Sequence, residues 1–241
     1  MAESLRENIA IVQERIAAAC RRAGRPSEEV RLVAVSKTVP AVLIREAYDA
    51  GLRHFGENRV PEAGEKLATL TDLDITWHLI GHLQTNKARA ARAVFHWVHS
   101  VDSSRVAEKL ASSPPANSVE SGQPREQPRR LKVLIEVNLG GEAAKSGIAE
   151  EGALDLARAV ARLGSLELCG LMLVPPYFED AELSRPFFSR LRELAKVVNS
   201  AGLPAVAMKE LSMGMSYDFE VAVEEGATLV RVGTAIFGAR S

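Results

Sequence analysis

The chain has 241 residues, and its 30 lysines and arginines nearly balance 31 aspartates and glutamates, which gives a formal net charge of -1 at pH 7. This balance excludes a global electrostatic attraction to nucleic acid or to a membrane surface and favours a small-molecule partner. The length exceeds the usual single-domain size of about 150 residues, but α/β barrels reach it as one domain.

Residues 1–24 combine acidic residues with apolar positions that recur at the helical period. This pattern predicts an N-terminal amphipathic helix that ends near Gly24 and Pro26, and it is not that of a signal peptide. No apolar run approaches the ~20 residues needed to span a bilayer. Cys20 and Cys169 stand outside any metal-ligand or CxxC spacing, so we expect structural thiols in a cytoplasmic protein without membrane contact.

Short apolar strand candidates then alternate with helix candidates along the chain. Because these strands are apolar on both faces, the alternation favours a closed parallel (β/α)8 TIM barrel that spans 1–241 as a single domain with an extra N-terminal helix. A doubly wound sheet is the alternative, but the first strand lacks a following GxGxxG turn. The eight predicted strands are residues 31–37, 53–57, 76–81, 96–102, 132–138, 167–173, 209–214 and 228–233.

Residues 112–130 interrupt this order with a segment rich in proline, serine, glutamine and charge. The segment has no apolar periodicity, which predicts a flexible loop insertion. It follows a helix and precedes the fifth strand, so we expect it at the N-terminal face of the barrel. That face lies away from the expected site, and the loop should be dispensable for chemistry.

The first strand candidate, "RLVAVSK", ends in a lysine. Strand side chains alternate between faces, so Val33, Val35 and Lys37 share one face. Inside a barrel mouth, desolvation lowers the pKa of a lysine and leaves a neutral amine that can form a Schiff base with an aldehyde. The alternative is a lysine that marks the exit of the strand into solvent.

The loops after the last two strands predict a phosphate site, because barrels frequently bind phosphate there. Ser216 is a candidate cap of the helix after the seventh strand, and Gly233 with Thr234 opens a short final helix. Helix starts of this kind present backbone N–H groups to an anion, although serine and glycine are also ordinary capping residues. Phosphate together with an aldehyde suggests pyridoxal 5′-phosphate (PLP).

Arg231 lies on the same strand face as Gly233 and can reach inward beneath a ring held by Lys37. A PLP site must place some group opposite the pyridine nitrogen. An arginine there cannot accept a proton, so the ring would be a poorer electron sink than one that faces an aspartate. The alternative role of Arg231 is a salt bridge inside the barrel, for instance with Glu57 or Glu136.

Several blocks of the sequence, in order, resemble the YggS/PROSC family of pyridoxal phosphate homeostasis proteins: "LVAVSKTVP", "HFGENRV", "WHLIGHLQTNKAR", "VHSVD", "LIEVN", "GLM" and "LSMGMSYDFEVAVEEGATLVRVGTAIFGAR". The resemblance covers nearly the whole chain and implies a barrel like the N-terminal domain of alanine racemase. It also implies that Lys37 forms the Schiff base, Asn58 lies beside the ring, Ser212 or Ser216 holds the phosphate with Gly233 and Thr234, and Arg231 faces the pyridine nitrogen.

Other patterns carry less weight. His78 and His82 have the i, i+4 spacing of a zinc pair, but they flank a strand end where this spacing does not bring them together, so we predict no metal site. His96 and His99 are interpreted as packing or surface residues. The basic residues of 87–92 are interpreted as a solvated helix face and not as an RNA-binding surface.

The resemblance implies a protein that holds PLP in intracellular vitamin B6 homeostasis, without turnover and with transient contacts to PLP-dependent enzymes. The alternative is a PLP-dependent racemase or decarboxylase of amino acids, and a third class is a phosphate-binding barrel with a structural Lys37. Racemases with this barrel add a β-domain that supplies a second base, whereas this sequence ends after the eighth unit. No tyrosine falls at a strand end. We expect a monomer or weak dimer.

Overall fold

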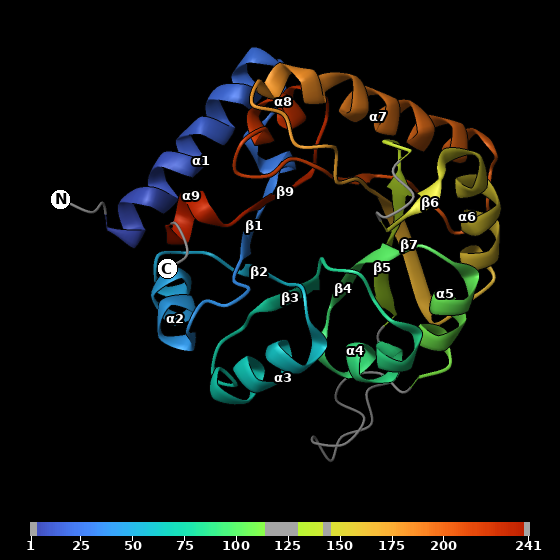
Figure 1. Cartoon of the computed structure of the whole chain (residues 1–241), viewed down its shortest axis with the longest axis horizontal. Helices are drawn as coiled ribbons and strands as arrows, with labels where there is room; N and C mark the ends of the chain where they lie inside the picture. The colour runs from blue at the N-terminus through green and yellow to red at the C-terminus, as the bar shows by residue number, and fades with distance from the viewer. Residues whose placement is uncertain (1–3, 114–129, 142–145, 239–241) are drawn as a thin grey trace.

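The computed structural model describes residues 4–113, 130–141 and 146–238. Within these residues eight parallel strands form a closed barrel in the order β4-β3-β2-β1-β9-β8-β7-β5, and pairing of β4 with β5 closes it (Figure 1). The predicted barrel and its strands are confirmed. The barrel strands are β1 (Arg31–Val35), β2 (His54–Glu57), β3 (Thr76–Leu79), β4 (Trp97–Val101), β5 (Leu131–Asn138), β7 (Leu166–Met172), β8 (Glu210–Ser212) and β9 (Leu229–Val232).

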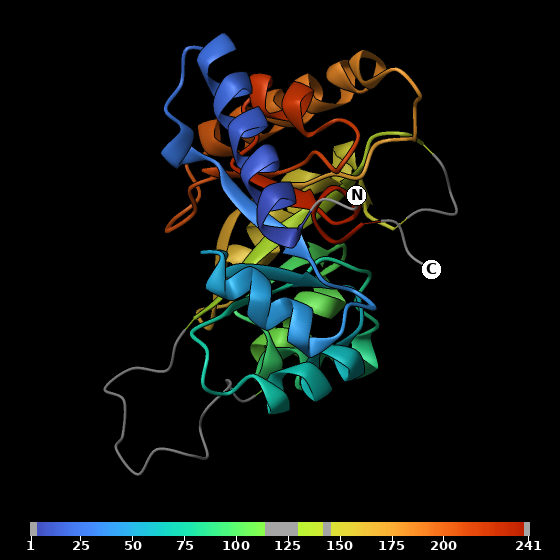
Figure 2. The same ribbon diagram turned by 90° about the vertical axis from the view of Figure 1, so that its left-hand side faces the viewer.

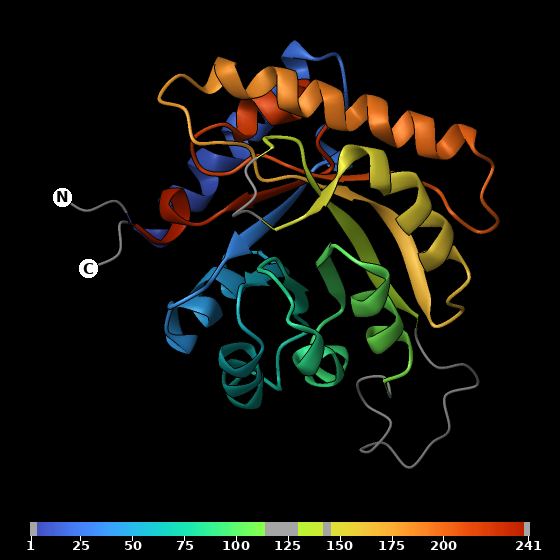
Figure 3. The ribbon, with the colours of Figure 1, turned by 45° about the vertical axis from the view of Figure 1, so that its right-hand side comes forward.

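A two-residue strand, β6 (Ile148–Ala149), pairs in parallel with the end of β5 and was not predicted from the sequence. Helices surround the barrel on its outer side (Figures 1 and 3). They are α1 (Leu5–Arg22), α2 (Ala41–Asp49), α3 (Val60–Thr69), α4 (Ala88–Val94), α5 (Ser104–Ala111), α6 (Ala153–Ala161), α7 (Arg185–Ser200), α8 (Phe219–Glu224) and α9 (Thr234–Phe237).

The extra N-terminal helix, α1, begins with a capping box. The backbone N–H of Glu7 donates to the Ser4 hydroxyl, and the backbone N–H of Ser4 donates to the Glu7 carboxylate. Figure 2 shows α1 lying along the outside of the last βα units. Ion pairs of Arg15 with Glu220 and of Arg22 with Glu224 tie it to α8, so this helix covers the outer side of the units that carry the predicted phosphate loops.

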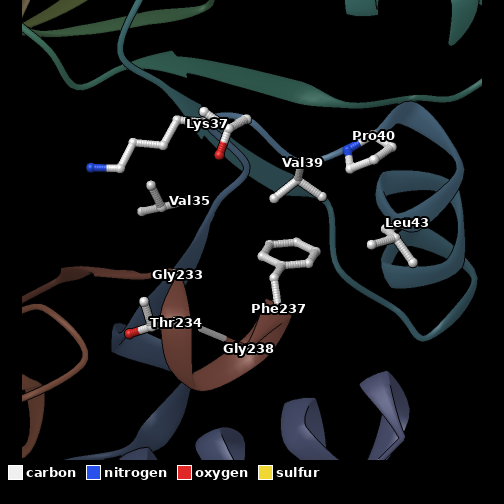
Figure 4. Close-up of a pocket in the computed structure, with 10 residues that line it drawn as sticks. Val35, Lys37, Val39, Pro40, Leu43, Gly233, Thr234, Phe237 and Gly238 are labelled. Atoms are coloured by element: carbon white, nitrogen blue, oxygen red, sulfur yellow. The ribbon is translucent and has the colours of Figure 1, made fainter. Parts of the chain in front are cut away.

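Side chains alternate between the inside of the barrel and the layer beneath the helices. Val33 belongs to an interior cluster with Trp97, Leu134 and Leu229, whereas the next residue, Ala34, belongs to the outer core. Lys37, two residues beyond the strand, lines a cavity together with Val35, and Figure 4 shows both side chains on the same side of the chain. The predicted sharing of one face thus holds for Val35 and Lys37.

Two sequence interpretations need comment. Arg92 is only 3% exposed, so the solvated-face interpretation of 87–92 is wrong at this residue. The cause is that α4 buries the face that carries Ala88, Ala91 and Arg92. The loop insertion 112–130 falls almost entirely outside the described residues. Among the described helices, none has the length and apolar character that crossing a bilayer requires.

Candidate cofactor-binding site

Lys37 lies two residues beyond the end of β1, where it is half-buried. It lines a cavity of about 200 Å³ together with Val35 on its own strand and with Gly233 and Thr234 at the end of β9. In Figure 4 the lysine side chain extends past Val35 on the side where Gly233 and Thr234 lie. The remaining wall comes from α2, α9 and the segments before and after them, through Thr38, Val39, Pro40, Leu43, Phe237 and Gly238.

The loops after β8 and β9 meet at Ser216 and Gly233. The backbone N–H of Gly233 donates to the Ser216 hydroxyl over 3.3 Å. Gly233 packs closely on β1, since a Cβ at this position would lie 3.3 Å from the Cβ of Val35. The predicted capping role of Ser216 is wrong, because α8 begins only at Phe219 with Asp218 before it. The Ser216 hydroxyl is thereby left to face the β9 loop.

Arg231 lies inside the barrel and is 4% exposed. Its guanidinium donates to the Ser212 hydroxyl over 2.6 Å and to the Leu173 carbonyl over 2.8 Å. Burial lowers the pKa of Arg231 to about 10, against the opposing attraction of Asp218 and Glu136. The group therefore keeps its charge at neutral pH.

The alternative salt bridge of Arg231 with Glu57 does not form. Glu57 points outward from β2, where its carboxylate accepts from Ser36 and from Lys66. Glu136 attracts Arg231 electrostatically. Asp218 and Glu136 are thus the carboxyl groups whose attraction stabilises the charge of Arg231.

Ser212 is fully buried next to Arg231. Its hydroxyl accepts from Arg231 and contacts Nδ1 of His99 at 2.9 Å. These partners differ from those of Ser216, whose hydroxyl lies at the β9 loop. The two serines that the sequence offers as phosphate ligands therefore have different surroundings.

Asn58 follows β2 and is half-buried. Its side-chain oxygen Oδ1 is buried and has no hydrogen-bond partner among the described residues. A buried acceptor without a donor is costly and suits a ligand that brings one. The backbone of Gly81 presses against this residue, since a Cβ on Gly81 would lie 2.5 Å from the Asn58 carbonyl oxygen. The close approach of Gly81 thus limits the positions that Asn58 can adopt.

Glu136, on β5, is a residue of this mouth that sequence reasoning did not place in the site. It is 7% exposed, and its Oε2 lacks a hydrogen-bond partner among the described residues. Burial, assisted by repulsion from Asp102, raises the pKa of Glu136 to about 7, although Arg231 opposes the shift. A single glutamate in the apolar run "LKVLIEVN" was the available signal. A carboxyl with this pKa exchanges protons at neutral pH.

The predicted site residues fall into three groups. Lys37, Gly233 and Thr234 line one cavity, and Ser216 joins them through Gly233. Arg231 and Ser212 form a buried pair inside the barrel. Asn58 follows β2, the strand next to β1, and is not part of the wall of that cavity. The amine, the hydroxyl and backbone donors, the guanidinium and the unsatisfied amide oxygen fit the aldehyde, phosphate and ring of PLP.

The histidines do not form a metal site in the described part of the chain. No group of three or more His, Cys, Asp or Glu side chains there is arranged to hold an ion. His78 contacts His54 and His99 inside the barrel. His82 lies apart from His78, with its Nδ1 3.2 Å from a carboxylate oxygen of Asp102.

Comparison with known proteins places the chain in a family. The model of the alanine racemase N-terminal domain matches residues 3–241. The pyridoxal phosphate homeostasis protein of Pseudomonas aeruginosa is 47% identical over 237 residues, which cover 98% of this chain and 96% of that one. The chain belongs to the pyridoxal phosphate homeostasis protein family. Its counterpart in Aquifex aeolicus is 44% identical over 234 residues, which cover 97% of each chain.

A solved structure with the same fold is PipY of Synechococcus elongatus with PLP bound. It is 40% identical to this chain with a TM-score of 0.74, and the match covers 94% of this chain and all of PipY (100%). The family resemblance that the sequence blocks indicated is thus confirmed. The match extends along the barrel that carries Lys37 at its mouth.

Proposed function

We propose that this chain binds PLP and acts in intracellular PLP homeostasis. The observation that carries the proposal is that Lys37 shares one cavity with Gly233 and Thr234, so an amine faces a backbone and hydroxyl cradle. The names of the relatives and the PLP in the PipY structure support it. Residues 1–241 would act as one PLP-binding barrel domain.

Bound PLP supplies an aldehyde, which can form a Schiff base with a lysine, and a ring that accepts electron density. Lys37 is the residue that would make this covalent link. Ser216, Gly233 and Thr234 would bind the phosphate. Ser212 contacts Arg231 and His99, which favours a role in positioning Arg231 for that serine.

Arg231 and Asn58 would contact the ring. A guanidinium that stays charged offers donors and no acceptor, so Arg231 can hold a ring nitrogen but cannot take up its proton. The unsatisfied Asn58 oxygen offers an acceptor. An arginine at the ring nitrogen would leave that nitrogen unprotonated and the ring a weaker electron acceptor, which would favour storage of the cofactor over reaction.

The chain would act without turnover, since two of its three tyrosines are poorly placed to serve as a second proton carrier. Tyr177 and Tyr217 are 70% and 64% exposed, and their rings pack edge to face with centroids 5.5 Å apart. General acid–base catalysis needs a second group positioned within hydrogen-bond reach of the reacting atom. The third tyrosine, Tyr48, lies on α2, and its ring packs beneath the guanidinium of Arg53.

Racemase or decarboxylase activity toward amino acids is the second candidate, and Glu136 favours it. With a pKa of about 7 and an unpartnered oxygen, Glu136 is the carboxyl in this mouth suited to move a proton at neutral pH. Exchange of the α-proton of a panel of amino acids in D₂O, followed by NMR, separates the two candidates. Exchange that Glu136→Gln abolishes would establish turnover and overturn the carrier proposal.

Borohydride reduction of the PLP-loaded protein, followed by mass analysis of its peptides, tests the binding site. We expect a pyridoxyl mass on the peptide that contains Lys37, its loss in Lys37→Ala and its retention in Lys209→Ala, a change at an exposed lysine. A pyridoxyl mass on a different lysine would move the covalent link. No retained cofactor would refute the proposal.

We further propose that the protein is a monomer or weak dimer that contacts PLP-dependent enzymes only transiently. Such contacts would let the cofactor pass to an enzyme without a stable complex. Light scattering across a concentration series gives the oligomeric state. Transfer of PLP to an apo-enzyme, faster than its release into buffer, would support direct contact, and equal rates would exclude it.

A further inference from the structure

A continuous row of hydrogen-bonded side chains crosses the inside of the barrel. Nδ1 of His54 lies 3.0 Å from Nε2 of His78, and Nδ1 of His78 lies 2.9 Å from Nε2 of His99. Nδ1 of His99 lies 2.9 Å from the Ser212 hydroxyl, which accepts from Arg231 over 2.6 Å. The row runs from β2 through β3 and β4 and then across to β8 and β9. We call it the histidine row.

The two inner rings are neutral. His78 and His99 are both fully buried, and burial is the main cause that lowers the pKa of each well below the usual value. The charges of Arg231 and Arg31 lower the pKa of His99 further. The indole of Trp97 stacks on His78 at 5.6 Å and fills the space beside it. A neutral imidazole has one donor and one acceptor, so each ring must donate at one nitrogen and accept at the other.

The charge of Arg231 sets the direction of these bonds. A guanidinium only donates, so the Ser212 oxygen accepts from it, and an N–H that points at the positive charge is disfavoured. The Ser212 hydroxyl therefore donates to Nδ1 of His99. It follows that His99 donates from Nε2 to Nδ1 of His78, and that His78 donates from Nε2 to Nδ1 of His54. All donors then point away from Arg231.

The outer end of the row reaches the N-terminal side of the barrel. His54 is half-buried and lines a hollow of about 430 Å³ together with Arg31 and Arg53. The groups that face it are His78 on β3, Arg31 on β1 and Lys132 on β5, and burial with these two cations lowers the pKa of His54. If His54 takes up a proton, its Nδ1 carries a hydrogen and can no longer accept from His78.

We propose that His54, His78 and His99 are positioning residues that orient Ser212 and, through it, Arg231. Protonation of His54 on the N-terminal side would then disturb the donor geometry of Arg231 at the opposite end of the row. The final step, from Arg231 to PLP, rests on the proposed function, whereas the row itself does not. The sequence-based interpretation of His99 as a packing residue would then be incomplete.

NMR of the apo protein with ¹⁵N-labelled histidine tests the row without any cofactor. We expect His54, His78 and His99 to be neutral Nε2–H tautomers at pH 7. During acidification the signals of His78 and His99 should shift with the same midpoint as His54, because the row loses its outer acceptor. An Nδ1–H tautomer at His99 would overturn the assigned direction. If the signals of His78 and His99 stay unchanged while His54 titrates, the proposed coupling between the three histidines is wrong.

Two substitutions of His54 separate positioning from simple packing. His54→Leu removes the acceptor, whereas the side-chain oxygen of His54→Asn can stand near the place of Nδ1. We expect His54→Leu to change the His99 tautomer signal and to weaken PLP binding roughly tenfold, and His54→Asn to restore both. Equal effects of the two variants would refute the proposal.

The wild-type titration decides the same question if His54→Leu does not fold. A failure of the proposed function can be distinguished from a failure of the histidine-row proposal. The wild-type protein would then bind no PLP, while the tautomers of the apo protein would still report on the row.

Discussion

The ammonium group of Lys66 on α3 lies 2.6 Å from the backbone carbonyl of Ser36 and 2.8 Å from Oε1 of Glu57. On the other side of Lys37, the backbone N–H of Thr38 donates to Glu62 over 2.5 Å, and Thr38 has a φ of +64°. A threonine in this left-handed region is strained. Both neighbours of Lys37 are therefore held by charged groups, which fix the direction of the lysine.

Lys66→Met should destabilise the protein by about 3 kcal/mol at pH 8, because it leaves the fully buried Glu57 without its cation. Burial already raises the pKa of Glu57 against the attraction of Lys66, and the substitution should raise it further. A carboxyl group whose pKa is raised in the folded state stabilises the fold at low pH. This stabilisation disappears as the pH rises through the raised pKa. The loss should thus be smaller at pH 5. Urea denaturation at both pH values measures it.

The double variant Lys66→Met with Glu57→Gln should recover most of the lost stability, because no charge is then buried alone. Lys196→Met is a suitable control, since its pair with Glu193 is exposed on both sides, at 64% and 55%, and such pairs contribute less than about 1 kcal/mol. If Lys66→Met and Lys196→Met cost the same, the contacts of Lys66 do not hold this segment.

The sequence predicted the barrel, its eight strands and the direction of Lys37, because these depend on local periodicity. The contacts of Lys66 with Ser36 and Glu57 depend on how α3 packs over β1 and β2. The local sequence pattern carries no information about this packing. The histidine row depends on strand register in the same way. His54 pairs with Thr76 and His78 with Trp97, and a shift by one residue would turn each ring to the other face.

Glu136→Gln should stabilise the apo protein at pH 8. Its pKa is raised from 4.5 to about 7, so the stabilising contribution of the protonated form is complete below about pH 4.5 and is lost as the pH rises through 7. One pKa unit corresponds to about 1.4 kcal/mol, so the rise from 4.5 to about 7 predicts a gain of about 3 kcal/mol at pH 8. Chemical denaturation as a function of pH gives the gain directly.

No gain is expected for Glu136→Gln at pH 4.5, where the wild-type residue is already protonated. Glu108→Gln changes an exposed glutamate on α5 and should leave stability unchanged at both pH values. A gain at pH 8 that persists at pH 4.5 would mean that packing of the amide, and not titration of Glu136, is the cause.

Gly81→Ala should displace Asn58 and weaken PLP binding, since the new Cβ would lie 2.5 Å from the Asn58 carbonyl oxygen and 2.8 Å from its Cα. Such overpacking costs about 1–3 kcal/mol. Gly64→Ala, inside α3, meets nothing within 4 Å and should stabilise the protein by about 0.5–1 kcal/mol. Thermal unfolding and PLP titration of both variants measure these effects. Unchanged binding in Gly81→Ala would remove Asn58 from the site.

Arg231→Gln should weaken PLP binding by roughly 10- to 100-fold, equivalent to about 1.4–2.8 kcal/mol. The amide can keep one donor to Ser212 or to the Leu173 carbonyl, so the barrel should fold and retain its circular dichroism spectrum. Loss of the guanidinium also removes the attraction that opposes the raised pKa of Glu136. The variant should therefore lose more stability at pH 8 than at pH 5.

Reduction with borohydride at saturating PLP separates the affinity of the site from the reactivity of Lys37. The pyridoxyl mass on the Lys37 peptide should still form in Arg231→Gln, because the arginine binds the ring and does not make the covalent link. Arg158→Gln, which breaks an exposed pair with Asp155, should bind PLP as the wild type does. If Arg231→Gln also binds as tightly as the wild type, the guanidinium does not face the cofactor, and its bonds to Ser212 and Leu173 serve the barrel alone.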